Sequence, residues 1–358
     1  MRAGRIPWMR VGAVSVIVGM STMLQAAGVK GDQPLPLESA TVVTQDVPLG
    51  LEDPSAYIPA DNPQTAQKIE LGRMLFFDKR LSKTNTVACA NCHMPGLAFT
   101  DGQAVSMGIN RLQGGRSAPV AINRLYSKVQ FWDGRAQTLE EQSTGPFINP
   151  VEHGFLDYDE MTTKMKKLSG YRQLFKEVFA DDITEKNIGK AIASFQRTLL
   201  SGNSPADRFD FGGDEQALTP SAQRGLEVFR GKARCTRCHS GFNFSDEKFH
   251  NLGIGWDTNQ VDLGRYMVTK NPEDVGAFKT PTLREISRTA PYMHDGRFGT
   301  LEEVVNFYNQ GGIQNPHLDN TVIPLELAES EKQDVVAFLR SLNGEGWQQA
   351  TAPTEFPQ

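Results

Sequence analysis

The four cysteines of this 358-residue chain are divided equally between two copies of the pattern Cys-x-x-Cys-His. The residues of the two copies are Cys89, Cys92, His93, Cys235, Cys238 and His239. This spacing is typical of covalent c-type haem attachment, in which the thiols bond the porphyrin and the histidine ligates the iron. A zinc site would need ligands converging from two distant segments, and a thioredoxin-like redox pair needs no histidine after its second cysteine. We therefore expect two covalently bound haem c groups.

Residues 1–27 have the pattern of a secretory signal peptide. Three arginines precede an apolar run over 11–24, and small residues follow at 26 and 27, which is the order of regions in a cleavable signal. The run is shorter than the roughly 20 residues of a spanning helix, so an uncleaved anchor is the weaker alternative. Haem attachment to thiols normally accompanies export in bacteria, and we expect a periplasmic protein. Loss of the three arginines takes the formal net charge from -5 to -8, and this weak acidity argues against nucleic-acid binding.

Two blocks of sequence recur around the haem motifs. The segments 133–141 and 295–303 agree at seven of nine positions, and both contain Thr-x-x-Glu, a capping box that starts a helix. Similar helical stretches at 66–71 and 222–227 precede the motifs, each with a proline near its expected first turn. The simplest explanation is an ancient duplication of a one-haem unit.

The repeat predicts a mainly α fold made of two cytochrome c-like haem domains. Helical periodicity is clear at 188–199 and 330–342, whereas alternating strand patterns are scarce. Long loops at 98–119 and 253–281 are expected to wrap the haems, and turn residues at 200–218 predict a linker. The predicted divisions are a signal peptide (1–27), an N-terminal extension (28–60), an N-terminal haem domain (61–209), a C-terminal haem domain (210–347) and a tail (348–358).

The helix that follows the second repeat block carries a candidate iron ligand. Leu301, Val304, Val305 and Tyr308 are spaced as one buried stripe. In the first half, the position equivalent to Tyr308 is Pro146. A tyrosine phenolate can ligate ferric haem and proline cannot, so the second iron would be closed and the first left open. The alternative for Tyr308 is a core aromatic whose hydroxyl is satisfied by the protein.

Nearly the whole mature chain, from 71–77 to 336–339, resembles the bacterial di-haem cytochrome c peroxidase family, and more narrowly its MauG-like branch. The motifs that carry the resemblance are Phe-Trp-Asp-Gly-Arg-Ala at 131–136, Asn-Pro-Val-Glu at 149–152, Phe-Lys-Thr-Pro-Thr-Leu-Arg at 278–284 and Ala-Pro-Tyr-Met-His-Asp-Gly at 290–296. The resemblance implies reduction of hydrogen peroxide at the N-terminal haem, with electrons passing through the C-terminal haem.

Roles at the first haem follow from the same resemblance. It makes His93 the proximal ligand and Glu152 the distal carboxylate that moves a proton between the peroxide oxygens. Gln142 and Pro146 match a polar neighbour and a non-coordinating wall of that pocket. An isolated glutamate is more often solvated surface, and the Asn-Pro-Val-Glu context is what favours catalysis for Glu152.

At the second haem, the resemblance makes His239 the proximal ligand. Typical peroxidases place a methionine on the opposite side, where this chain has Tyr308, as MauG-like proteins do. Trp132 matches a tryptophan between the haems and would relay electrons or holes; the alternative is a packing tryptophan. His250 could hydrogen-bond a haem propionate or lie on the surface.

Two departures from the family pattern matter. Typical peroxidases have a histidine after the first haem motif that blocks the oxidised enzyme, whereas this chain has Ile109 there. The resemblance then implies reactivity with peroxide in the diferric state, unless His153 or Met107 serves as a sixth ligand. The family also binds calcium between its haems. The residues that match its calcium ligands are Thr289 and Pro291, as carbonyl donors, and Ser117, which replaces an asparagine and makes calcium a weaker expectation.

Three functions remain open from the sequence. The first is a peroxidase that receives electrons from a small c-type cytochrome or a cupredoxin. The second is an oxidase that uses peroxide to modify tryptophan or tyrosine residues of a partner protein, which Tyr308 and Ile109 favour. The third is a non-enzymatic di-haem electron carrier, against which Pro146 speaks. Family members are often dimers, so a homodimer is an expectation by analogy alone.

Overall fold

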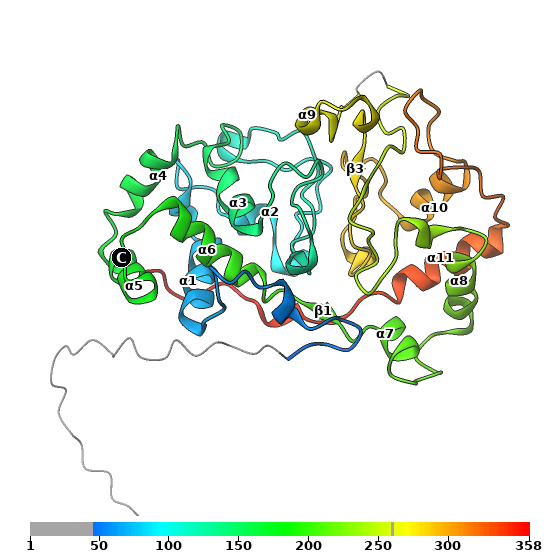
Figure 1. Cartoon of the computed structure of the whole chain (residues 1–358), viewed down its shortest axis with the longest axis horizontal. Coiled ribbons are helices and arrows are strands. Elements are labelled where there is room, and N and C mark those ends of the chain that lie inside the picture. Colours follow the sequence, from blue (N-terminus) through cyan, green and yellow to red (C-terminus); the bar gives the residue numbers. More distant parts are fainter. Residues whose placement is uncertain (1–45, 259–260) are drawn as a thin grey trace, which may run out of the picture. The chain divides into compact units, whose positions relative to one another are not determined.

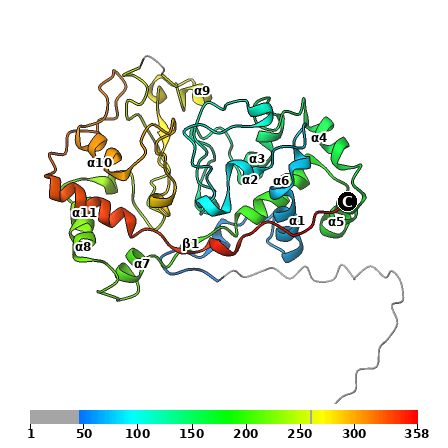
Figure 2. The same ribbon diagram turned by 180° about the vertical axis from the view of Figure 1, so that it is seen from behind.

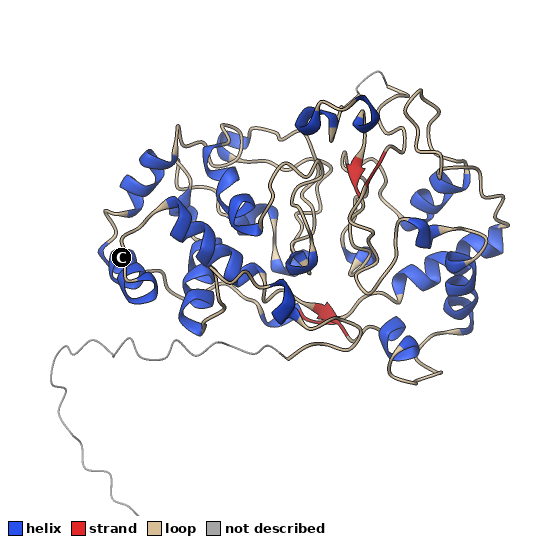
Figure 3. Cartoon of the chain, in the orientation of Figure 1, coloured by secondary structure: helices blue, strands red, loops and turns tan. Residues whose placement is uncertain are grey.

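The computed structural model describes residues 46–258 and 261–358. The predicted signal peptide lies outside the described residues. The architecture is mainly helical, as the sequence predicts, with helices on the two flanks and long loops between them (Figure 3). The helices are α1 (Ala66–Phe77), α2 (Cys89–Cys92), α3 (Leu139–Thr144), α4 (Tyr158–Met165), α5 (Ser169–Phe179), α6 (Glu185–Gln196), α7 (Pro205–Asp210), α8 (Pro220–Arg230), α9 (Tyr266–Thr269), α10 (Leu301–Asn309) and α11 (Glu329–Arg340).

Strands are short and form two antiparallel pairs in the described part of the chain. The strand β1 (Ser201–Gly202) pairs with β4 (Glu345–Gly346), and β2 (Phe249–His250) pairs with β3 (Phe278–Lys279). The first pair joins segments far apart in sequence below the two halves, and the second lies among the loops of the second half (Figure 1). Short 3₁₀ turns connect many of the remaining segments.

Threonine caps begin the helices that the two repeat blocks predict. Thr138 Oγ1 accepts from Glu141 N (3.1 Å) at the start of α3, and Thr300 Oγ1 accepts from Glu303 N (3.2 Å) at the start of α10. The capping box at Thr300 is complete. Before α8, Pro220 takes the first helical position after its Thr219 cap, as expected for a residue without an N–H.

One predicted detail of the first half requires correction, and one helix is shorter than its counterpart in the second half. Pro63 lies before the helix rather than in its first turn, because Thr65 caps α1 and accepts from Lys68 N. The helix α3 is only six residues long and passes into a 3₁₀ turn over Gly145–Ile148 that contains Pro146. Proline cannot donate the hydrogen bond that would continue an α-helix. The equivalent helix α10, which has tyrosine at that position, runs for nine residues.

The main helix pair of each half crosses at a glycine. A methyl group on Gly72 of α1 would lie 1.9 Å from the carbonyl oxygen of Ala191 on α6. A methyl group on Gly225 of α8 would lie 1.8 Å from the carbonyl oxygen of Asp334 on α11. In each pair, a phenylalanine Cβ of the partner helix lies 3.0 Å from the same point. Only glycine permits so close an approach of two helices, and the matching crossings are what a duplicated unit would contain.

Each half has its own hydrophobic core, but the chain ends do not stay within one half. After α11 the chain forms β4 and returns to the first half, where its end lies beside α5 (Figures 1 and 2). Trp347 is buried in the first core, and the carbonyl of Gln358 accepts from Gly170 N. In the other direction, the carbonyl of Gly50 accepts from Arg284 of the second half at 2.9 Å. Both terminal segments therefore tie the halves together.

The segment predicted as a linker contains regular secondary structure and a buried ion pair. It contains β1 and α7, and Asp207 on α7 forms a fully buried ion pair with Arg284 (Nη1 to Oδ2, 2.8 Å).

Among the helices of residues 46–258 and 261–358, none has the length and hydrophobicity that a membrane-spanning helix needs.

Replacing Gly225 with alanine is expected to lower the free energy of unfolding by about 1–3 kcal/mol, because the added methyl group overlaps the α11 backbone. Thermal unfolding followed by circular dichroism measures the change. Gly96→Ala is the matched control, since no atom lies within 4 Å of the new methyl position. Equal melting temperatures for the two variants would contradict the proposed close crossing.

Candidate haem sites

The histidine of each motif is fixed by one backbone carbonyl. His93 Nδ1 lies 3.0 Å from the carbonyl oxygen of Phe99, and His239 Nδ1 lies 3.0 Å from that of Phe244. Both phenylalanines have left-handed backbone conformations, with φ of 57° and 50°. Because a carbonyl can only accept, Nδ1 must carry the proton, which leaves the Nε2 lone pair available for iron. Burial lowers the pKa of both histidines and so favours this neutral form.

A large cavity lies against the first motif. It has an empty volume of about 1430 Å³, part of it open to solvent, and is lined by both Cys92 and His93. The helix α3, the turn after it and the loops on either side bring further polar and apolar groups to its wall. These are Phe131, Trp132, Arg135, Gln142, Pro146 and Glu152. The structure therefore brings together the first-haem residues that the sequence singled out.

Glu152 is a partly buried carboxylate on this wall. Its Oε1 accepts from Asn149 Nδ2 at 2.6 Å. Burial raises its pKa, while the charge of Arg135 and the hydrogen bond from Asn149 act in the opposite direction. A carboxyl group with a raised pKa is suited to accept and return a proton near neutral pH.

The loop position that typical peroxidases fill with histidine is packed into the protein. The N–H of Ile109 donates to the carbonyl of Glu152 at 2.9 Å, and its side chain is 6% exposed. A methyl group on Gly154 would lie 2.0 Å from Ile109 Cδ1. This segment is therefore held firmly against the residues that carry Glu152.

Neither alternative sixth ligand lines the first cavity. His153 is buried, its Nδ1 lies 2.7 Å from the Leu81 carbonyl, and its ring packs edge-on against Phe147 at 4.9 Å. Burial lowers its pKa to about 4. Met107 is 43% exposed on the surface. Pro146 remains on the cavity wall and has no atom that could coordinate iron.

A second cavity lies against the second motif. Its empty volume is about 1830 Å³, part of it open to solvent, and its wall includes both cysteines of the motif and His239. All four residues of the predicted α10 stripe line it, namely Leu301, Val304, Val305 and Tyr308. The Tyr308 hydroxyl makes no hydrogen bond to any residue within 46–258 or 261–358, so the alternative of a hydroxyl satisfied by the protein finds no support there. Burial, followed by the charges of Cys238 and Cys235, raises the Tyr308 pKa.

Trp132 lines both cavities. Its indole Nε1 donates to the Ser117 carbonyl at 2.8 Å, and its own carbonyl accepts from Lys279 N at 2.8 Å. The repeat-equivalent residue His294 lines the second cavity, stacks on Phe278 at 3.6 Å between ring centroids, and accepts from Ser117 N. Trp132 is thus fixed by main-chain contacts from both halves.

The residues expected to hold calcium all line the second cavity. They are Ser117, Thr289 and Pro291. Two main-chain groups of Ser117 are already engaged, its carbonyl with Trp132 and its N–H with the His294 carbonyl.

His250 also lines the second cavity, but both of its ring nitrogens have carboxylate partners. Nδ1 contacts Asp319 at 2.5 Å and Nε2 contacts Asp246 at 2.9 Å. The suggested bond to a haem propionate would therefore need one of these contacts to break. Cys238, Asp246 and His250 form the only cluster with metal-ligand spacing in the part of the chain that the structure describes. Since Cys238 belongs to a haem motif, its sulfur would be bonded to porphyrin.

Two arginines on the cavity walls were not predicted from the sequence. Arg124 lines both cavities, and Arg135 lines the first, with its guanidinium 3.6 Å from the Phe131 ring centroid. The recurrence of Arg135 as Arg297 in the second repeat block was a usable signal. Arg124 carries no such pattern, because only the fold brings it between the motifs.

The residues present fit two haems. Each cavity is large and adjoins a Cys-x-x-Cys-His motif, and each motif histidine uses Nδ1 for its bond to a backbone carbonyl. The Nδ1 bonds are the outer contacts that usually orient metal-ligating histidines.

Comparison with known proteins gives the same result. A model of the di-haem cytochrome c peroxidase family matches residues 66–216. The methylamine utilization protein MauG of Methylophilus methylotrophus is 41% identical over 293 residues, spanning 80% of this chain and 85% of that protein. The cytochrome-c peroxidase IdrP1 of Pseudomonas sp. (strain SCT) is 39% identical over 321 residues, spanning 81% of this chain and 84% of that protein.

A solved structure agrees with the observed fold. The crystal structure of a MauG-like protein associated with microbial copper homeostasis matches with a TM-score of 0.74 at 31% identity, covering 88% of this chain and 97% of that chain. The chain therefore belongs to the di-haem cytochrome c peroxidase family, which makes it an oxidoreductase acting on hydrogen peroxide and implies two haem cofactors.

Proposed function

We propose that this protein reduces hydrogen peroxide at the haem held by His93, and that the haem held by His239 and Tyr308 transfers electrons or stores oxidising charge. The observation that carries the proposal is the difference between the two distal walls. Pro146 occupies the first wall and cannot coordinate iron, while Tyr308 occupies the equivalent place in the second.

A bound haem supplies an iron that can take peroxide as a ligand and exchange electrons. Glu152 accepts a proton from the near oxygen of peroxide and returns it to the far oxygen, which assists cleavage of the O–O bond. Gln142 provides a polar contact on the same wall, and Pro146 leaves the remaining space free.

Tyr308 and Trp132 give the second site its different role: Tyr308 would bind the iron, and Trp132 would connect the two sites. Because burial raises its pKa, the Tyr308 phenol keeps its proton unless a cation replaces it, and ferric iron is such a cation. When haem is bound, a phenolate oxygen from Tyr308 would favour the oxidised iron and lower its reduction potential. Trp132, which lines both cavities, provides a route for electrons or holes between them.

The runner-up is a MauG-like oxidase that directs the oxidising charge at tryptophan or tyrosine residues of a partner protein. The burial of Ile109 favours it, because no histidine of that loop can close the oxidised first haem. A third alternative, a di-haem electron carrier without peroxide chemistry, would need a sixth ligand at the first iron. Neither His153 nor Met107 lines that cavity.

We further propose that the protein works in the periplasm and that a small c-type cytochrome or a cupredoxin supplies its electrons. Calcium held by the carbonyls of Thr289 and Pro291, with Ser117 nearby, remains a prediction from the family resemblance. Steady-state peroxide consumption with a reduced small cytochrome separates the two enzymatic functions. Sustained turnover supports the peroxidase, whereas an oxidised spectrum that persists without turnover supports the oxidase.

Glu152→Gln is expected to slow the reaction with peroxide by about 10²- to 10⁴-fold, because the amide cannot accept a proton. Stopped-flow absorbance of the oxidised protein mixed with peroxide measures the rate. The rate for the unchanged protein should fall as the pH is lowered through the raised Glu152 pKa, and the variant should lose this dependence. The exposed residue Glu227 provides the control Glu227→Gln. A variant rate within twofold of the control would refute the proton-transfer role.

Tyr308→Phe is expected to raise the reduction potential of the second haem and change its ferric absorption spectrum, because the anionic oxygen ligand is lost. The first haem should keep its potential. Tyr292→Phe is the matched control, since Tyr292 also lines the second cavity but its hydroxyl donates to the Ile286 carbonyl at 3.0 Å. Redox titration followed by visible absorption reads both haems, and identical curves for the two variants would exclude Tyr308 as a ligand.

A further inference from the structure

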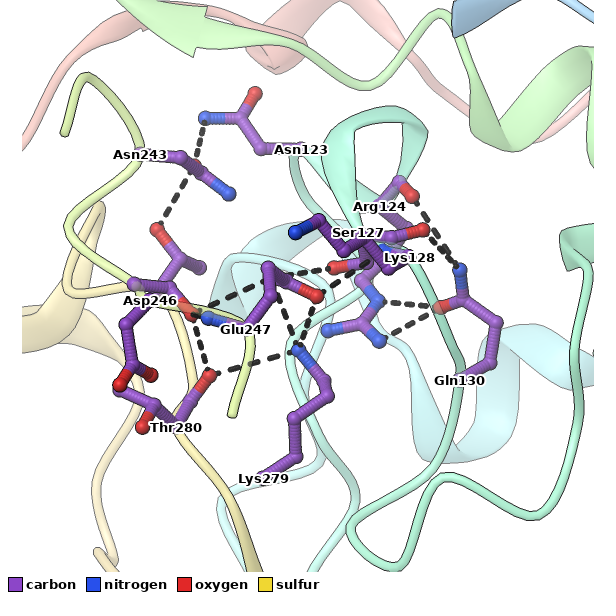
Figure 4. Close-up of polar contacts among 12 residues, drawn as sticks. Asn123, Arg124, Ser127, Lys128, Gln130, Asn243, Asp246, Glu247, Lys279 and Thr280 are labelled. Carbon is purple, nitrogen blue, oxygen red and sulfur yellow. Dashed lines mark hydrogen bonds and ion pairs between the residues drawn. The ribbon is translucent and has the colours of Figure 1, made fainter. Parts of the chain in front are cut away.

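A buried polar cluster contains residues from both halves of the chain (Figure 4), and some of them line the haem cavities. We define this inter-haem cluster as Arg124, Gln130, Glu247 and Lys279. The first two residues come from the first half of the chain and the last two from the second half. Arg124 is 8% exposed and Lys279 is 3% exposed. Arg124 lines both cavities, Gln130 lines the first, and Lys279 lines the second.

The charges of the inter-haem cluster are not balanced by direct pairs. Lys279 Nζ lies 3.1 Å from each oxygen of Glu247, which completes one ion pair. Arg124 Nε and Nη2 donate to the neutral Gln130 Oε1 at 2.9 and 2.6 Å. Arg124 forms no ion pair, and its Nη1 forms no hydrogen bond, with any residue in the described ranges. Asp246, another carboxylate drawn in Figure 4, contacts His250 Nε2 at 2.9 Å.

A buried cation without a partner is unfavourable, and proteins normally compensate it with an anion. Burial lowers the Arg124 pKa, and burial together with the Arg124 charge lowers the Lys279 pKa to about 8. The lowered pKa values of both cations indicate that additional negative charge would stabilise the cluster. The guanidinium can bind carboxylates through two parallel N–H groups.

The position of Arg124 is fixed by its surroundings. The preceding residue, Asn123, has a left-handed backbone (φ 57°) and is itself buried. Its side chain donates to the Ser201 carbonyl at 3.0 Å and accepts from Ser201 N at 2.9 Å, which ties the turn to β1. Gln130 then holds two of the guanidinium donors. The surrounding contacts therefore hold the Arg124 guanidinium in one position, as in a preformed anion-binding site.

We propose that Arg124 binds propionate carboxylates of both haems and so forms one shared anion site between the two cofactors. Lys279 contributes to the side of this site that faces the second cavity. Because reduction adds an electron to each haem, a positive charge beside both of them raises both potentials. One residue would then set the potentials of the two haems together.

The test uses the full protein with both haems attached, first counted by the pyridine haemochrome assay. In Arg124→Gln, both reduction potentials are expected to fall, as read by spectroelectrochemical titration. Lys279→Gln should lower the potential of the second haem more than that of the first. Arg172→Gln, which removes an exposed arginine of α5, is the matched control and should change neither. A fully loaded Arg124→Gln protein in which only one potential falls, or neither, would overturn the proposal.

If Arg124→Gln does not fold with two haems, Arg124→Lys and infrared spectroscopy provide a second test. Arg124→Lys keeps the charge but replaces the planar fork with one ammonium group. The carboxylate bands of the propionates in redox-difference infrared spectra should shift in this variant, and unchanged bands would contradict binding. The inference depends on the haems of the proposed function but not on peroxide reduction. Shifted potentials in a protein inactive with peroxide would therefore contradict the proposed function alone.

Discussion

The hydrogen bond from each motif histidine to a backbone carbonyl is the interaction on which both sites depend. His93 and His239 each use Nδ1 for this bond, with acceptors six and five residues further along the chain. The acceptor residues Phe99 and Phe244 both have left-handed backbone conformations. With Nδ1 engaged, the imidazole keeps one orientation and presents Nε2 to the iron. The helices around each cavity then decide what stands on the opposite side of that iron.

The two halves share a similar arrangement of helices, but the cavity walls opposite the motif histidines differ. The helix α10 is long enough to present Tyr308 at the second cavity. In the first half, Pro146 ends the equivalent helix early and leaves a wall without a ligand. The residue between the cavities also differs between the repeats, since Trp132 corresponds to His294 in the second half. These single-residue differences turn a repeated unit into one reactive site and one electron-transfer site in the proposed function.

Local signals in the sequence predicted the parts of the structure that depend on neighbouring residues. The haem motifs, the threonine caps of α3 and α10, and the α10 stripe follow from spacing and from backbone chemistry. The mainly helical fold follows from periodicity. Long-range packing was not readable in the same way. The return of Trp347 to the first core and the place of Arg124 between two cavities depend on contacts between distant segments. Pro63 was misplaced because Thr65, a better cap, begins the helix two residues later.

Low-temperature electron paramagnetic resonance of the fully oxidised protein examines the asymmetry of the two irons most directly. An open first iron and a second iron with histidine and tyrosine ligands should give one high-spin and one low-spin ferric signal. Each signal should account for one haem per chain. Two low-spin signals of equal intensity would contradict the open first site, because another residue would then have to close the iron beside His93.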